Sequence, residues 1–245
     1  METFAVEINN VQYSYDSNPF INNLNLSVKQ NDRFGLFGPN GAGKTTIMSL
    51  MTGLLKPKAG AVTVFGKSVS ADKRVKSILG FVPQDFSFYS ELTPKENLQF
   101  FGAWYGLNKT EIKSRTEELL SVLGLSDVAN KQVKLFSGGM KRRVNIAIGV
   151  IHKPQVLFLD EPTAGVDIQS RHAIVNYLKD INAKGTTLIY TSHHLKEAEE
   201  LCQHIALIDE GKIIAHGEMK QLIESNNETT LEGLFLKLTG NAYRD

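Results

Sequence analysis

The chain has very little cysteine and no long hydrophobic run. Cys202 is the one cysteine in 245 residues, so no disulfide can form within the chain. So few cysteines are typical of a reducing compartment, and we expect a cytoplasmic location. The longest apolar runs, such as "VLFL" and "IAIGVI", fall far short of the roughly 20 residues that span a bilayer. The first ten residues contain neither the basic start nor the apolar stretch of a signal peptide.

The chain also has almost no excess of charge of either sign. Its 27 basic and 26 acidic residues leave a net charge of +1 at pH 7. Binding to nucleic acid through general electrostatic attraction needs an excess of positive charge. We therefore expect no nucleic-acid partner, and we interpret the basic run "KRR" at 141–143 as a solvated face of a helix.

Apolar segments of strand length alternate with segments of helical periodicity. The short apolar runs are "RFGLF" at 33–37, "ILGFVPQ" at 78–84, "QVLFLDEP" at 155–162 and "TTLIYTS" at 186–192. This alternation predicts an α/β fold with a mostly parallel sheet covered by helices. Residues 4–30 are strand-like around a polar turn, and "IALIDEGKII" is typical of a hairpin.

The pattern also predicts how one domain of 245 residues is divided. We expect a nucleotide-binding core with its β subdomain over 1–85 and 151–217, and an inserted helical subdomain over 86–150. A helical tail should follow over 218–245, with Thr229 and Glu232 forming a capping box.

The stretch "FGPNGAGKTT" at 37–46 carries the first functional signal. It fits the P-loop pattern G-x-x-x-x-G-K-[ST], and an apolar strand precedes it while a helical pattern follows. Backbone N–H groups of such a loop and the start of the next helix bind phosphate. Lys44 can reach the β- and γ-phosphates, Thr45 can ligate Mg²⁺ and Thr46 can contact a further phosphate oxygen. The predicted nucleotide contacts are Gly38, Pro39, Asn40, Gly41, Ala42, Gly43, Lys44, Thr45 and Thr46.

Two acids end the apolar strand "VLFLDE". Asp160 and Glu161 therefore lie at the carboxyl edge of the predicted sheet, where open α/β sheets bind ligands. We expect Asp160 to hold Mg²⁺ and Glu161 to polarise the attacking water.

The stretch "FSGGMKRR" at 136–143 predicts a second anion site. Ser137 is a good N-cap, and Gly138 and Gly139 expose backbone N–H groups at the start of a basic helix. One nucleotide has no use for two such sites in one chain. We therefore predict that two copies face each other and that each completes the nucleotide site of its partner.

Taken together, these motifs resemble those of the nucleotide-binding subunits of ATP-binding cassette (ABC) transporters. The resemblance covers nearly the whole chain, with a Walker A loop "GPNGAGKTT", a signature "SGGMK" and a Walker B strand "LFLDEP" in the usual order. It implies a P-loop NTPase (RecA-like) core with an N-terminal antiparallel β subdomain. It further implies a Q-loop glutamine at Gln84 that senses Mg²⁺, a D-loop aspartate at Asp167, a switch histidine at His193 and an adenine-stacking Tyr15.

Within this family the chain resembles the branch that energises exporters of drugs, antibiotics or polysaccharides. The resemblance implies ATP and Mg²⁺ as ligands, a homodimer and a separate transmembrane permease at the cytoplasmic face of the membrane. Met140 and Ile168 depart from the commoner family residues, but neither replaces a catalytic group.

Two alternatives stay open at this point. An importer subunit differs from an exporter subunit only by resemblance to a branch. A soluble ABC ATPase acting on a macromolecular complex usually has two cassettes or a long coiled coil, whereas only about 50 residues separate Gln84 from Ser137 here. Residues 86–105 are rich in aromatics, and we expect them to contact the permease: Phe86, Phe88, Tyr89, Phe100, Phe101, Trp104 and Tyr105.

Overall fold

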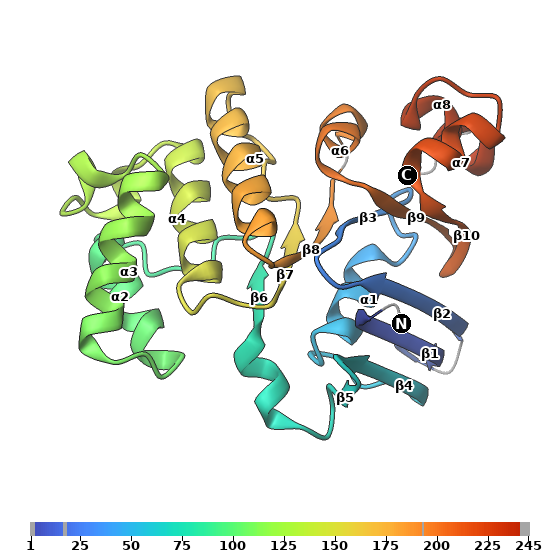
Figure 1. Cartoon of the computed structure of the whole chain (residues 1–245), viewed down its shortest axis with the longest axis horizontal. Helices are drawn as coiled ribbons and strands as arrows, with labels where there is room; N and C mark the ends of the chain where they lie inside the picture. The colour runs from blue at the N-terminus through green and yellow to red at the C-terminus, as the bar shows by residue number, and fades with distance from the viewer. Residues whose placement is uncertain (1–2, 17–18, 193, 241–245) are drawn as a thin grey trace. The chain divides into compact units, whose positions relative to one another are not determined.

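The computed structural model describes residues 3–16, 19–192 and 194–240, which fall into two compact units. The first unit comprises Met1–Lys76 and Thr187–Asp245, and the second comprises Ser77–Thr186. Their elements are labelled in Figure 1. His193 lies outside the described residues, so its predicted role stays a prediction.

The first unit contains an antiparallel sheet built from the N-terminal part of the chain. Its strand order is β2-β1-β4-β5, with β1 (Phe4–Tyr13), β2 (Ile21–Lys29), β4 (Ala59–Val64) and β5 (Lys67–Ser68). From Val6 to Gln12, the buried apolar residues of β1 are separated by less buried polar ones, so this part of the strand has one buried side. The antiparallel β subdomain predicted from the sequence is confirmed.

A second group of strands in this unit is mostly parallel. Its order is β10-β9-β3-β8, with β3 (Arg33–Phe37), β8 (Thr187–Thr191), β9 (His204–Asp209) and β10 (Lys212–Glu218). β3 runs parallel to both β8 and β9, whereas β9 and β10 form the antiparallel hairpin expected at "IALIDEGKII". All five residues of β8 are buried, as expected for a parallel strand covered on both faces.

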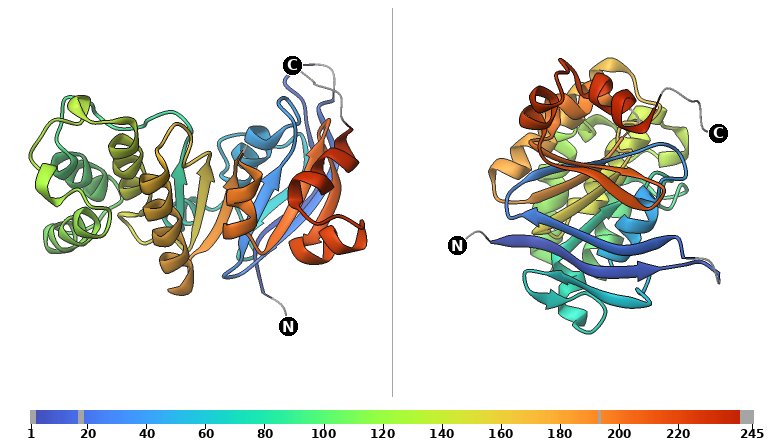
Figure 2. Two further views of the ribbon diagram at one scale, coloured as in Figure 1. Left: turned by 90° about the horizontal axis from the view of Figure 1, so that it is seen from above. Right: turned by 90° about the vertical axis from the view of Figure 1, so that its right-hand side faces the viewer.

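The helices of the first unit follow its strands. They are α1 (Lys44–Met51), α6 (Leu195–Leu201), α7 (Met219–Ser225) and α8 (Leu231–Thr239), and Figure 2 shows α7 and α8 beside each other next to β10. The prediction that Thr229 and Glu232 form a capping box is wrong, because α8 begins one residue later than expected. Glu199 accepts a hydrogen bond from the Leu231 N–H, and Thr230, not Thr229, caps the helix by accepting from Gly233 N. The third helical position is then a glycine, which has no side chain to complete a box.

The second unit holds two parallel strands and four of the described α-helices. β6 (Leu79–Val82) pairs with β7 (Val156–Asp160), and α2 (Pro94–Trp104) packs on both α3 (Lys109–Val122) and α4 (Gly138–Val150). α5 (Ile168–Ala183) packs on α4 (Figure 1). Short 3₁₀ turns occupy Ser126–Val128 and Val133–Leu135, and another, Lys73–Ile78, begins in the last residues of Met1–Lys76. Capping boxes begin α2 at Thr93 and α3 at Asn108, and each fixes a helix start by pairing two backbone N–H groups.

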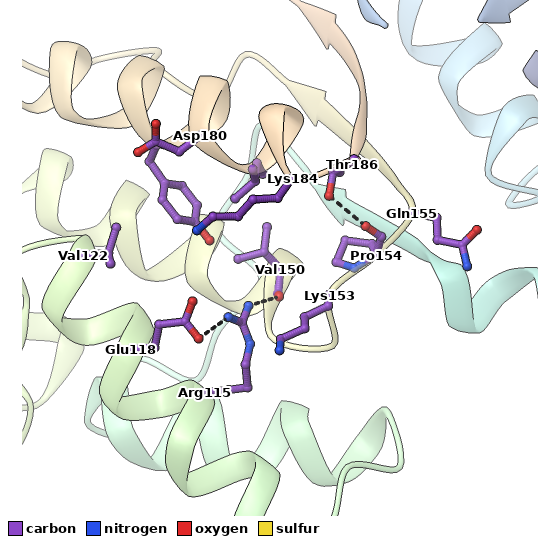
Figure 3. A pocket seen from close by; sticks show the side chains of 13 residues that line it. Arg115, Glu118, Val122, Val150, Lys153, Pro154, Gln155, Asp180, Lys184 and Thr186 are labelled. Atoms are coloured by element: carbon purple, nitrogen blue, oxygen red, sulfur yellow. Dashed lines mark hydrogen bonds and ion pairs between the residues drawn. The ribbon is translucent and has the colours of Figure 1, made fainter. Parts of the chain in front are cut away.

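A buried arginine joins two of these helices. Arg115 of α3 donates to Val150 O at 2.9 Å (Figure 3) and to Ile151 O at 3.2 Å, so it pairs carbonyls at the end of α4. The same side chain borders a cavity of about 550 Å³ that also contacts Tyr177, whose pKa is raised to about 12 by burial. None of the predicted site residues lines this cavity. Across the described part of the chain, no helix combines the length and the hydropathy that a membrane span requires.

Candidate nucleotide-binding site

The predicted P-loop lies between β3 and α1 and has the backbone geometry of an anion site. Gly43 is the N-cap of α1 with a φ of 109°, and Gly41 has a φ of 76°, both in the left-handed region that glycine tolerates. α1 has no side-chain cap and no acidic residue in its first turn. The start of α1 and the positive end of its dipole are therefore suited to a phosphate.

Lys44 brings a positive charge to the same place. The side chain is buried, and its Nζ donates to Gly38 O at 2.9 Å and to Pro39 O at 3.0 Å. Both acceptors belong to the loop itself, so the ammonium group is held where the loop surrounds a phosphate. The residues present thus fit a polyphosphate ligand.

Tyr15 lies beside the P-loop and the start of α1. Its hydroxyl is 2.7 Å from Thr46 Oγ1, while 64% of the residue remains exposed. An exposed ring next to a phosphate-binding helix is available to stack on a base. The structure adds Phe20, which lies 6.0 Å from the Tyr15 ring and also approaches Gly43. Sequence analysis missed Phe20 because β2, the strand it precedes, carries no motif.

Asp160 ends the buried strand β7 in the second unit and Glu161 follows it, as predicted. Asp160 is buried, and Glu161 has a φ of 48°, a left-handed conformation that is uncommon for a residue with a side chain. Such backbone strain costs on the order of 1–3 kcal/mol and is concentrated at functional sites. Gln84 Nε2 donates to Glu161 Oε2 at 3.4 Å, so the structure brings together two residues that are 77 positions apart.

The signature stretch begins α4 as predicted. Ser137 is the N-cap, and its Oγ accepts from Met140 N at 3.3 Å. Ser137 and Gly138 are exposed, whereas Gly139 is buried. A Cβ at Gly139 would come within 2.7 Å of Ser170 Oγ, so this position has no room for a side chain. The first turn of α4 contains no acidic residue, which leaves its N-terminus suited to an anion.

Asp167 has a structural role beside its predicted one. It is the N-cap of α5, and its two oxygens accept from Ser170 N and Ser170 Oγ, each at 2.8 Å. These hydrogen bonds to Ser170 hold the pKa of Asp167 below its usual value. The carboxylate therefore stays ionised, and it is fixed close to Gly139 of the signature stretch.

The interpretation of 141–143 as a solvated face is wrong for its middle residue. Arg142 is only 4% exposed, because it turns toward the segment that carries Gln84 and not toward solvent. Lys141 and Arg143 are partly exposed. Burial of one arginine in three residues follows from the helical period, since successive side chains point about 100° apart.

Known proteins that are similar to this chain are ATP-binding proteins, in agreement with a nucleotide site. Residues 21–164 match the ABC transporter family. Over 89% of its length the chain is 42% identical to the linearmycin resistance ATP-binding protein LnrL of Bacillus subtilis, covering 70% of that protein. Over 91% of its length it is 39% identical to the Nod factor export ATP-binding protein I of Cupriavidus pinatubonensis, covering 69% of it.

Two solved structures have the same fold. One is an ATP-binding subunit of an ABC transporter, with a TM-score of 0.88, 27% identity and coverage of 96% of this chain and 99% of the other. The second is cbiO1 of Clostridium perfringens, part of the ABC transporter complex cbiONQ, with a TM-score of 0.81, 26% identity and coverage of 92% and 95%. The chain belongs to the ABC transporter family. It is an ATP-binding subunit of the kind that hydrolyses ATP to power transport.

Proposed function

We propose that this ATPase powers export of a substrate through a separate transmembrane permease. The observation that carries the proposal is the likeness, over about nine tenths of the chain, to ATP-binding proteins named for antibiotic resistance and for Nod factor export. Import remains the second candidate, because cbiO1 belongs to a different transporter complex and has the same fold.

In this proposal the P-loop binds the phosphates of ATP and Tyr15 stacks on the adenine. Lys44 offsets charge on the β- and γ-phosphates, which is the main catalytic contribution a protein makes to phosphoryl transfer. Thr45, Gln84 and Asp160 supply a hydroxyl, an amide oxygen and a carboxylate, all hard oxygen donors that suit Mg²⁺. The metal would supply further charge neutralisation on the phosphates.

Glu161 is the proposed residue that orients the attacking water. Its carboxylate accepts from Gln84, and its left-handed backbone fixes the direction of the side chain after β7. His193 would assist by contacting the γ-phosphate. Of Glu161 and Gln84, only the carboxylate of Glu161 can accept a proton from water. Glu161 therefore takes that role, and Gln84 positions its carboxylate.

The second half of each site comes from a second copy of the chain. Ser137, Gly138 and Gly139 would face the γ-phosphate bound by the partner, with Asp167 next to Gly139. Ser137 and Gly138 are exposed, and the first turn of α4 presents backbone hydrogen-bond donors and contains no acidic residue, which supports this assignment.

Aromatic residues of the second unit form the proposed permease contact. Phe86, Tyr89, Phe100 and Trp104 are all exposed, and Trp104 is 78% exposed. The rings of Tyr89 and Phe100 meet edge to face with their centroids 5.0 Å apart. The Phe100 ring also stacks on Trp104, with centroids 6.5 Å apart. Exposed aromatic groups of this kind are enriched at protein interfaces. Docking there would place the subunit on the cytoplasmic side of the membrane.

Transport in membrane vesicles tests the direction. The chain is produced together with its permease, and inside-out vesicles are given ATP and candidate amphiphilic antibiotics. Export predicts ATP-dependent accumulation in these vesicles and none with Glu161→Gln. Accumulation only in right-side-out vesicles that have been loaded with ATP would establish import instead. A protein that purifies with a soluble complex and no membrane protein would contradict both.

A further inference from the structure

Two side chains of α4 contact the residues around Gln84, here called the Q-loop segment (residues 83–87). Arg142 and Asn145 are three positions apart, so they share one face of the helix. Arg142 Nη1 donates to Gln84 O at 2.9 Å and to Pro83 O at 3.2 Å. Asn145 Nδ2 donates to Pro83 O at 3.2 Å.

Asn145 also receives hydrogen bonds from the same segment. Its Oδ1 accepts from Ser87 N at 3.2 Å and from Ser87 Oγ at 3.1 Å. The Q-loop segment is thus held at both ends by one helix. Four of the five hydrogen bonds pair backbone donors or acceptors of this segment with a side chain of α4.

Burial makes these contacts strong. Arg142 is 4% exposed and Asn145 is 1% exposed. The Arg142 guanidinium carbon lies 4.9 Å from the centre of the Phe86 ring, which covers it on one side. Removing one partner of a buried hydrogen bond destabilises the folded protein strongly, because water cannot replace that partner.

The charge of Arg142 is compensated by the acids of the site. Burial lowers the pKa of Arg142, and the negative charges of Glu161, Asp85 and Asp160 oppose that change. Arg142 therefore remains a cation at neutral pH, since arginine is protonated even when buried. Its guanidinium lies among the carbonyls of the Q-loop segment, and Asp160 and Glu161 at the end of β7 are close enough to act on its charge.

We propose that Arg142 and Asn145 are positioning residues that hold Gln84 beside Glu161 and make the Q-loop segment and α4 move as one body. This inference rests on the proposed function. Ser137 lies five residues before Arg142, which is about 7.5 Å along the helix axis. A displacement of Gln84 by nucleotide is thereby passed to the signature residues at the start of the same helix.

Kinetics of Arg142→Gln give the first test. Gln84 would lose the carbonyl contacts that hold its peptide, while the P-loop is unchanged. We expect kcat for ATP hydrolysis to fall about tenfold or more, as for loss of a hydrogen bond to a charged group, with little change in KM. Arg142→Lys should recover part of the loss, because one ammonium group can still reach a carbonyl. Arg143→Gln is the matched control: Arg143 donates to Leu123 O and Gly124 O instead, and kcat should stay at the wild-type value.

Hydrogen exchange with and without ATP gives the second test, and it needs no activity. In the wild type, ATP should slow exchange at 44–48 and change exchange at both 84–87 and 138–141. In Arg142→Gln the change at 44–48 should persist, while the changes at 84–87 and 138–141 should no longer occur together. Ser87→Ala, at an exposed position, should give a smaller effect of the same kind without unfolding the chain.

The outcomes separate the two proposals. A wild-type chain that shows no ATP effect at 44–48 contradicts the proposed function. Normal ATP binding, a wild-type kcat in Arg142→Gln and coupled exchange in that variant would overturn the positioning role alone.

Discussion

Single residues of the site divide the work of binding and hydrolysis. Lys44 belongs to the P-loop, where its ammonium group lies on loop carbonyls, and Glu161 follows β7 with a strained backbone. A positive charge beside phosphates contributes to ground-state binding and to the transition state. A carboxylate that accepts a proton from water contributes only when the reaction proceeds.

Glu161→Gln should therefore keep ATP affinity and lower kcat by about 10²- to 10⁴-fold, the range for loss of general-base catalysis. Glutamine has the same shape, so the left-handed backbone is unaffected, but its amide is a poor proton acceptor. Lys44→Ala should weaken ATP binding itself. Nucleotide affinity and phosphate release measure the two effects, with Glu117→Gln on the exposed face of α3 as a control. Full hydrolysis by Glu161→Gln would reject Glu161 as the water-polarising residue.

His152 is a second case at this scale, and it concerns stability. Its Nε2 donates to Leu79 O at 2.9 Å, and its ring stacks on Tyr105 with centroids 3.7 Å apart. Nδ1 is buried and has no hydrogen-bond partner among the described residues. A proton added to Nδ1 would have no acceptor, so the folded chain favours the neutral ring. Burial accordingly lowers the pKa of His152.

This shift predicts a dependence of stability on pH. The unfolded chain binds the proton more readily, so the contribution of His152 is complete above about pH 6.5 and is lost as pH falls toward the folded pKa. The melting temperature should fall between pH 7.5 and 5.5, and less so in His152→Gln. His172→Gln, at an exposed position of α5, should keep the wild-type dependence. An unchanged slope in His152→Gln would refute the assignment.

At the scale of elements, ion pairs of similar length contribute differently to the stability of the folded chain, depending on how buried they are. Arg115 pairs with Glu118 at 2.6 Å and also binds the last carbonyls of α4, with 10% of its side chain exposed. Arg74 pairs with Asp72 at 2.8 Å and is 83% exposed. Hydrogen bonds to Arg74 lower the pKa of Asp72 to about 2, yet solvent screens an exposed pair.

Arg115→Gln should thus destabilise the chain by about 2 kcal/mol, because two buried carbonyls at the end of α4 lose a charged donor. Arg74→Gln should leave the denaturation midpoint unchanged within error. Urea denaturation of both variants measures the difference. Equal midpoints for the two variants would mean that α3 and α4 do not depend on this contact.

At the scale of the whole molecule, the two anion sites predict a shared pair of ATP sites. Ser137→Arg would place a bulky cation at the exposed start of α4, and Lys44→Ala would disable the P-loop. If Ser137 serves the partner, each mixed dimer contains one site with both defects and one intact site.

Mixing the two inactive chains should then restore activity, up to about a quarter of the wild-type value, since about half of the dimers are mixed and each has one complete site. The ATPase rate of the mixture measures this, with each chain alone as the control. ATP-bound Glu161→Gln should also scatter light as a dimer. No recovery in the mixture would show that Ser137 serves its own chain.

Sequence alone determined the parts of this protein that depend on neighbouring residues. The P-loop follows from glycines, a lysine and a threonine within ten positions, and the N-cap at Ser137 follows from the residues after it. The order of these motifs was enough to predict the family and the fold. Each of these features is set by local backbone preferences, which adjacent residues carry.

Only the tertiary structure decided which distant residues meet. Gln84 reaches Glu161, Tyr15 reaches Thr46, and Arg142 lies buried against the Q-loop segment rather than in solvent. Asp167 was predicted from its motif, but its capping of α5 beside Gly139 was not. Such contacts depend on how helices and strands pack across tens of residues of chain. A basic run has the same composition whether one of its side chains points outward or inward, so burial at Arg142 could be read only from the fold.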